Sequence, residues 1–112
     1  MADCLFCRIV RKEIPAQIVA ESDGCLAFRD INPQAPTHVL IIPKAHCDSL
    51  SSPGAPVLLA MVAVMAAEVA RDLGVADPGY RFVVNTGADG GQTVHHLHAH
   101  LLAGRALRWP PG

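Results

Sequence analysis

The chain has 112 residues, which is enough for one domain, spanning residues 1–112, with a small buried core. Apolar residues make up 51% of the sequence, which excludes a disordered protein. Nine basic against ten acidic residues give a formal net charge of −1, so nothing indicates a nucleic-acid surface, although a local pocket for one anionic ligand is compatible with this balance.

We expect no signal or transit peptide and no membrane segment, because the longest apolar run, residues 57–67, is too short to span a bilayer. The chain is therefore predicted to be cytoplasmic. Its four cysteines, Cys4, Cys7, Cys25 and Cys47, would then be reduced. A metal site is consequently a better explanation than a disulfide for a cysteine pair at metal-ligand spacing.

Proline and glycine residues divide the chain into short elements. The N-terminal half predicts a short helix over residues 5–11, followed by strands over residues 18–20, 25–28 and 39–42. A turn at Ser22-Asp23-Gly24 joins the first two strands, and Pro43 ends the third.

Pro56 begins a predicted helix of about five turns, over residues 56–73, with Gly74 at its C-terminal stop. The helix is apolar nearly all round as far as Ala67, so more than one of its sides should be buried. One side can cover the sheet and another can meet a partner helix, which predicts a homodimer. The alternative is a helix buried entirely within one subunit.

Two further strands are expected over residues 81–85 and 94–102, with a glycine-rich loop between them at residues 87–91. After the short first helix, the order β-β-β-α-β-β predicts an α+β fold. We expect an antiparallel sheet of about five strands, one long helix and a short N-terminal helix, with the helices mainly on one face of the sheet.

Histidine recurs at every second position near the C-terminus. Because side chains alternate along a strand, His96, His98 and His100 would share one face. Three interpretations compete: structural histidines, metal ligands, and nucleophilic and acid/base catalysis on a phosphoryl group. Packing explains three such histidines poorly. The preceding glycine-rich loop, a weak signal by itself, favours phosphoryl chemistry, because glycines let backbone N–H groups approach phosphate oxygens.

The run from His96 to Leu102 matches the pattern His-φ-His-φ-His-φ-φ, where φ is apolar. In this the chain resembles the histidine triad (HIT) superfamily of nucleotide hydrolases and transferases. Supporting segments are residues 28–38, 42–46 and 90–93, and the ending Trp-Pro-Pro-Gly at residues 109–112 resembles the Hint branch, the purine nucleoside phosphoramidases. The dinucleoside polyphosphate hydrolase branch typically carries Gln where this chain has His100.

The resemblance implies a homodimeric hydrolase that binds AMP- or GMP-type nucleotides and cleaves the P–N bond of purine nucleoside 5′-phosphoramidates. No metal would be required for this catalysis. His98 would be the nucleophile and form a nucleotidyl-histidine intermediate. His96 and His100 would orient His98 and bind the phosphate and leaving group, and His38 resembles the family's fourth histidine.

The resemblance also implies a nucleotide pocket. Asp30 would hold the ribose hydroxyls, and an apolar slot would grip the base, lined by Phe6, Ile9, Ile14, Phe28 and Ile31. The phosphate and leaving group would meet Asn85, Gly91, Gln92 and Thr93, and Trp109 would reach the partner subunit's active site. Thr93 stands where the Hint branch usually carries Ser, which leaves the leaving-group preference open.

Cys4 and Cys7 form a CxxC pair, which can contribute to a tetrahedral zinc site with two distant histidines. The alternative is two small buried thiols beside the start of a helix. Bacterial members of the superfamily with such a pair imply Cys4, Cys7, His46 and His96 as the ligands here. This zinc would be structural, because four protein ligands leave no open position for water.

Other functions remain open from the sequence. They are dinucleoside polyphosphate hydrolysis or nucleotidyl transfer at the same site, a non-enzymatic nucleotide-binding regulatory protein, and a hydrolase with a catalytic zinc ion.

Overall fold

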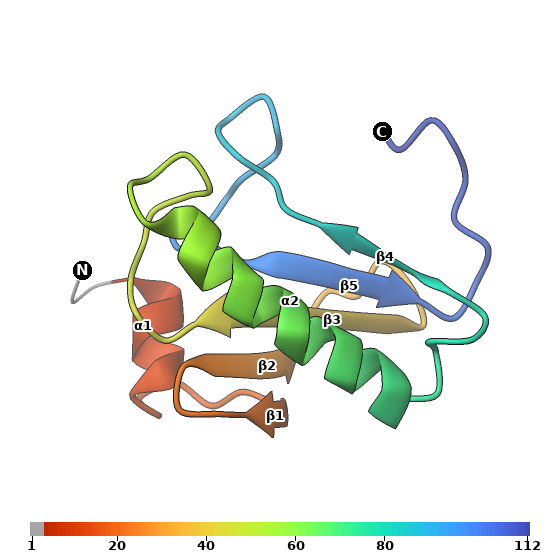
Figure 1. The fold of residues 1–112 in the computed structure, drawn as a ribbon, viewed down its shortest axis with the longest axis horizontal. Helices are drawn as coiled ribbons and strands as arrows, with labels where there is room; N and C mark the ends of the chain where they lie inside the picture. Colours follow the sequence, from red (N-terminus) through yellow and green to blue (C-terminus); the bar gives the residue numbers. More distant parts are fainter. Residues whose placement is uncertain (1–3) are drawn as a thin grey trace.

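The computed structural model describes residues 4–112, which form a five-stranded sheet and two helices (Figure 1). In chain order the elements are α1 (Leu5–Val10), β1 (Ile18–Glu21), β2 (Cys25–Arg29), β3 (Thr37–Pro43), α2 (Ala55–Asp72), β4 (Tyr80–Val83) and β5 (Ala99–Ala103). The predicted α+β composition is confirmed. Neither helix is long and apolar enough to cross a membrane within the described residues.

The strands lie in the order β1-β2-β3-β5-β4, and every neighbouring pair is antiparallel. The last strand, β5, therefore lies in the interior of the sheet between β3 and β4. Its register pairs Leu40 with His100 and Leu102 with His38. This pairing brings together two histidines that are 62 positions apart in the sequence.

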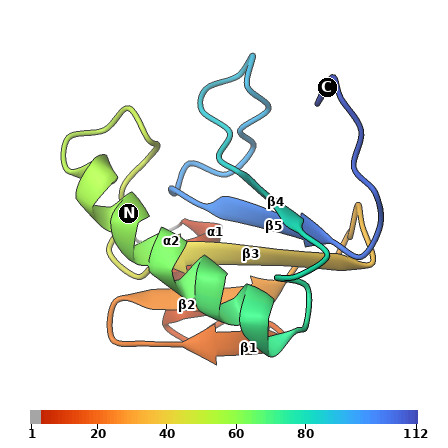
Figure 2. The same ribbon diagram turned by 45° about the vertical axis from the view of Figure 1, so that its right-hand side comes forward.

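The two helices lie on opposite faces of the sheet, as Figures 1 and 2 show. Helix α2 packs on the face formed by alternate apolar residues of the inner strands, which include Ala27, Val39, Ile41 and Leu101. Helix α1 packs on the other face through Phe6 and Ile9, against a second set: Leu26, Phe28, Leu40 and Ile42. The expectation that the helices lie mainly on one face is thus wrong, because α1 covers an apolar patch of its own.

Helix α2 has two apolar sides, but the sheet covers only one of them. Val62, Met65 and Val69 are buried against the sheet. Val57, Met61 and Val64 are 71%, 40% and 63% exposed. The alternative of a helix buried entirely within one subunit is therefore wrong.

The last strand begins at Ala99 and not at residue 94 as the alternation predicts. Pro43, at the end of β3, has no N–H to continue the ladder, and its carbonyl oxygen accepts a hydrogen bond from His96 Nε2 at 2.8 Å. The N–H of Leu97 donates instead to the carbonyl oxygen of Cys47 at 2.6 Å. Residues 94–98 consequently leave the sheet, and of the three triad histidines only His100 lies in a strand.

Candidate active site

Three histidines meet on the α1 side of the sheet. The ring centroids of His98 and His100 are 5.1 Å apart, and those of His38 and His100 are 5.2 Å apart. Phe6 packs edge-on against His98 at 5.1 Å and against His96 at 5.9 Å. Two of the three triad histidines therefore pack on a side chain of α1, a contact that the histidine pattern alone does not indicate.

A backbone N–H fixes the protonation pattern of His38 and His100. Gln34 N–H donates to His38 Nδ1 at 3.0 Å, so the proton of a neutral His38 lies on Nε2. That Nε2–H lies 2.9 Å from His100 Nδ1 and 3.4 Å from Asp30 Oδ2. His100 Nδ1 must then accept, which leaves the proton of a neutral His100 on its Nε2.

The tautomer of His98 follows from its contact with a carbonyl group. His98 Nδ1 lies 2.7 Å from the carbonyl oxygen of His96, which can only accept, so we assign the proton to Nδ1. The Nε2 of a neutral His98 then carries a lone pair. This is the atom that an imidazole nucleophile uses.

Burial keeps these imidazoles uncharged. Desolvation lowers the pKa of His38 and of His98 from the ordinary value. It also lowers the pKa of His100, to about 4, and repulsion by His98 and His38 adds to the effect. At neutral pH the free protein thus presents His98 in the form that can attack phosphorus.

A cleft of about 160 Å³ lies beside these histidines. All six residues predicted to bind the base and ribose line it: Phe6, Ile9, Ile14, Phe28, Asp30 and Ile31. Phe6 and Phe28 pack edge-on at 5.6 Å in its wall, whereas Ile31 is fully exposed. The sequence reasoning missed other lining residues, among them Leu5, Pro15 and Leu40.

Asp30 lies between this cleft and the histidines. Its Oδ1 accepts a hydrogen bond from Asn32 N–H at 2.7 Å, and its Oδ2 faces His38 Nε2. Each carboxylate oxygen can accept a second hydrogen bond, so the group retains capacity for ribose hydroxyls.

The glycine-rich loop is held closed by a buried glutamine. Gln92 Oε1 accepts from Gly87 N–H at 3.0 Å, and Gln92 Nε2 donates to the carbonyl oxygens of Asp48 and Val94 at 2.7 and 3.1 Å. The Gln92 amide is thus bonded to the backbone on every side, and its contact with a phosphate stays a prediction. Thr93 is exposed.

Two further residues were predicted to contact the ligand, one beside the glycine-rich loop and one in the C-terminal tail. Asn85 is half-buried, and its Nδ2 lies close to Gly91, whose φ of +86° suits glycine. Trp109 is 81% exposed in the C-terminal tail, so its role in a partner subunit's site stays a prediction.

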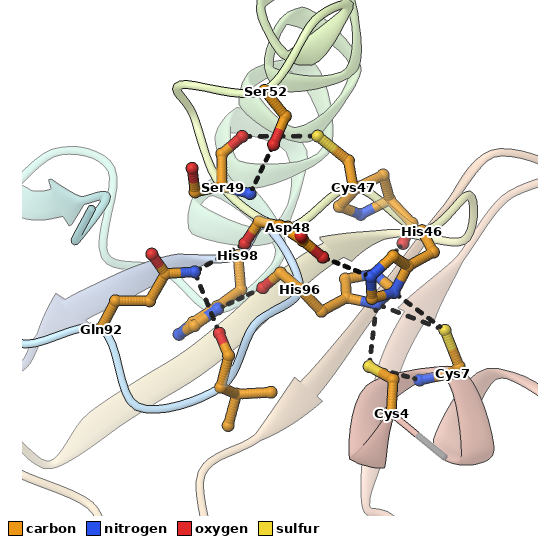
Figure 3. A network of polar contacts seen from close by, with 12 residues as sticks. Cys4, Cys7, His46, Cys47, Asp48, Ser49, Ser52, Gln92, His96 and His98 are labelled. Carbon is orange, nitrogen blue, oxygen red and sulfur yellow. Dashed lines mark hydrogen bonds and ion pairs between the residues drawn. The ribbon is translucent and has the colours of Figure 1, made fainter. Parts of the chain in front are cut away.

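A second cluster joins α1 to the histidine segment (Figure 3). The ligand atoms of Cys4, Cys7, His46 and His96 all lie within 4.8 Å of one another. His96 Nδ1 is 3.3 Å from Cys4 Sγ and 3.6 Å from Cys7 Sγ, and His46 Nδ1 is 3.3 Å from Cys7 Sγ. We call these four residues the metal cluster.

The outer nitrogens of the two cluster histidines already have acceptors. His46 Nε2 lies 2.8 Å from Asp48 Oδ1, and His96 Nε2 lies 2.8 Å from the Pro43 carbonyl oxygen. Both rings therefore carry their proton on Nε2 and turn a lone pair on Nδ1 toward the thiols, as zinc-binding histidines do. The donor set fits a tetrahedral zinc ion.

The residues that position these side chains were harder to predict. Gln34 and Pro43 act through their backbone, so their side chains give no signal. Asp48 has one, because it follows His46 by two positions and a carboxylate near a ligand histidine is a common second partner.

Comparison with known proteins agrees with this architecture. A model of the HIT domain family matches residues 11–107. An uncharacterized HIT-like protein of Synechocystis is 54% identical over 112 residues, which cover 98% of this chain and 97% of that protein. A 14 kDa zinc-binding protein of Zea mays is 48% identical over 113 residues, with 96% and 87% covered.

Solved structures give the same result. A HIT family hydrolase from Legionella pneumophila superposes with a TM-score of 0.94 at 49% identity and covers 98% of this chain and 100% of its own. A histidine triad nucleotide-binding protein from Candida albicans gives 0.83 at 31% identity, with 96% and 83% covered.

Proposed function

This chain belongs to the HIT domain family, and on that premise we propose that it is a Hint-type hydrolase that cleaves the P–N bond of purine nucleoside 5′-phosphoramidates. The observation that carries the proposal is the state of His98, a buried neutral imidazole held by the His96 carbonyl with its Nε2 lone pair free. The ending Trp-Pro-Pro-Gly and the presence of His100 support this branch over the dinucleoside polyphosphate hydrolases.

In the proposed first step, His98 Nε2 attacks the α-phosphorus while the bond to the amine nitrogen breaks. The Nε2–H of His100 donates a hydrogen bond to the departing group, and the amine leaves with one proton taken up from solvent. In the second step water attacks phosphorus, the P–N bond to His98 breaks and one proton is released. AMP and neutral His98 result, so the two protons balance.

The cleft and the loop would bind the rest of the nucleotide. Phe6 and Phe28 offer an apolar wall for a purine, and Asp30 lies where a ribose would meet the histidines. The phosphate would lie beside Asn85 and Thr93, next to the glycine-rich loop, whose Gly87, Gly91 and Gln92 N–H groups already donate within the loop. The Candida albicans relative is described as nucleotide-binding, which supports this assignment.

We also propose that residues 1–112 form one HIT domain and that two copies pair through α2. The exposed stripe Val57, Met61 and Val64 has the i, i+4, i+7 spacing of a helix–helix contact. Trp109 of one protomer would then complete the site of the other.

The metal cluster is proposed to hold one structural zinc ion. Two thiolates and two Nδ1 lone pairs leave no open position, so a zinc ion there supplies cross-linking of α1 to the histidine segment. The zinc-binding relative from Zea mays supports this assignment. Free thiols persist in reducing compartments, so a cytoplasmic location belongs to the same proposal.

Quenched-flow mass spectrometry with adenosine 5′-phosphoramidate tests the function. The wild type should gain the mass of one AMP on the peptide that contains His98, and His98→Ala should gain none. Faster turnover of a diadenosine polyphosphate would assign the other branch. AMP binding without turnover of either substrate would indicate a nucleotide-binding regulator.

A further inference from the structure

Resting on the proposed function, we infer that the metal cluster is a positioning device for catalysis, which holds His98 in its attacking tautomer and sets the wall of the base cleft. A purely structural zinc ion would affect only the stability of the N-terminal segment. Three separate contacts instead connect the cluster to the reacting group, and Figure 3 shows the first of them and part of the third.

The first contact runs through His96. Its ring belongs to the cluster, and its own carbonyl oxygen accepts the hydrogen bond from His98 Nδ1 at 2.7 Å. The ring is fixed at both nitrogens, by the thiols at Nδ1 and by Pro43 at Nε2. Fixing the ring of a fully buried residue also fixes its backbone, and so the direction of the carbonyl group that selects the His98 tautomer.

The second contact runs through Phe6, which lies between the two cysteine ligands in the chain. When Cys4 and Cys7 are both held, the backbone of Phe6 has little freedom. Its ring packs on His98 with an interplanar angle of 88° and on Phe28 with one of 74°. The same ring therefore touches the nucleophile and the base cleft.

The third contact runs through the loop that carries His46. The backbone carbonyl oxygen of Cys47 accepts the N–H of Leu97, the residue before His98, and the backbone carbonyl oxygen of Asp48 accepts from the Gln92 side chain, which closes the glycine-rich loop. The Asp48 carboxylate accepts from His46 Nε2 through its Oδ1. Movement of His46 would thus reach both the nucleophile segment and the phosphate loop.

Loss of the metal should therefore change the chemistry of His98 and not only its stability. A His98 released from the His96 carbonyl can carry its proton on either nitrogen. The form protonated at Nε2 has no lone pair there to attack phosphorus.

The test compares zinc-loaded wild type with the same protein stripped by a chelator, at one pH. Long-range ¹H–¹⁵N NMR of the histidine rings reports the His98 tautomer, and circular dichroism reports folding. We expect a pure Nδ1–H tautomer with zinc and a mixture without it. The single-turnover rate of AMP transfer to His98 should fall by about 10- to 100-fold, with a smaller change in AMP affinity.

Variants keep the inference testable if the stripped protein unfolds. His46→Gln removes one ligand without altering the identity of His96 or Phe6, so by weakening the metal site it should reproduce the tautomer mixture. Cys25→Ala, a buried thiol outside the cluster, is the matched control and should leave the spectrum unchanged.

An unchanged His98 spectrum on metal loss in a folded protein would overturn the inference, as would a lower melting temperature with an unchanged rate. Failure of the proposed function gives a different result. In that case zinc-loaded wild type would release no AMP from phosphoramidates, while the tautomer measurement would still report the coupling.

Discussion

The hydrogen bond between His38 and His100 can be tested by two substitutions of His38, which each preserve one of the two hydrogen bonds made by its ring. His38→Asn keeps an acceptor near the position of Nδ1 for Gln34 N–H but loses the donor to His100. His38→Gln keeps a donor near the position of Nε2 but loses the acceptor. If the donor holds the proton of His100 on Nε2, His38→Asn should slow catalysis and His38→Gln should restore most of it.

The magnitude follows from the geometry. His38 is 5% exposed and donates at 2.9 Å, so loss of the donor leaves His100 Nδ1 without its buried partner, at a cost of about 1–3 kcal/mol. If that cost falls on the transition state, kcat drops by about 5- to 160-fold. Steady-state kinetics with an adenosine phosphoramidate gives kcat and KM separately. Equal kcat values for the two variants, or a rise in KM alone, would refute the role of the hydrogen bond in catalysis.

Three further predictions concern stability, the glycine-rich loop and assembly. Because the pKa of His100 is about 4 in the fold and 6.5 as a free group, the unfolded chain binds more protons between these values, so stability should fall as pH drops from 6.5 to 4. Partial exposure limits this loss of unfolding free energy to at most about 3 kcal/mol. Urea titrations at several pH values should show a weaker pH dependence of stability for His100→Gln than for the wild type. Parallel plots of stability against pH for the two proteins would contradict this. Gln92→Glu replaces an amide donor by a carboxylate that faces two carbonyl oxygens, so it should lower the unfolding free energy by about 1–3 kcal/mol and raise KM. Gln92→Met should also lower the unfolding free energy, but without charge repulsion. Val64→Arg should yield monomers in sedimentation experiments while the melting temperature of the monomer is retained, and an unchanged sedimentation coefficient would place the dimer contact elsewhere.

Local patterns in the sequence were sufficient for most of the fold. The long helix begins within one residue of its predicted start, because Pro56 marks a first turn and Gly74 adopts the left-handed conformation after the last turn. The alternation of residues 99–103 correctly predicts that Ala99 and Leu101 pack under α2. These features depend on neighbours in the chain, which the sequence displays directly.

Contacts between distant segments were beyond the reach of the same reasoning. The early departure of residues 94–98 from the sheet depends on the absent N–H of Pro43 and on a bond to Cys47, about 50 positions away. The position of α1 on the opposite face depends on the apolar residues around Phe28. The alternating pattern places these residues on one face of a sheet but does not show which element packs on that face. The cleft lined by Phe6 and Phe28, which we propose binds the nucleotide, was predicted only through family resemblance, because its apolar side chains are indistinguishable from core residues in the sequence.

Two clusters of ligand-type residues lie close together in this site, and the hydrogen-bonding groups around them make them chemically different. In the cluster of Cys4, Cys7, His46 and His96, carbonyl and carboxylate oxygens hold each histidine proton outward, which turns the lone pairs inward toward a metal ion. In the cluster of Asp30, His38 and His100, the N–H of Gln34 forces the His38 proton inward, onto the nitrogen that a metal ion would need. A metal ion there would have to displace that proton or break the Gln34 bond. The first cluster is thus suited to hold zinc, and the second is suited to a hydrogen-bonded chain of neutral histidines. His96 belongs to the first cluster through its ring, and its carbonyl oxygen contacts His98, the proposed nucleophile.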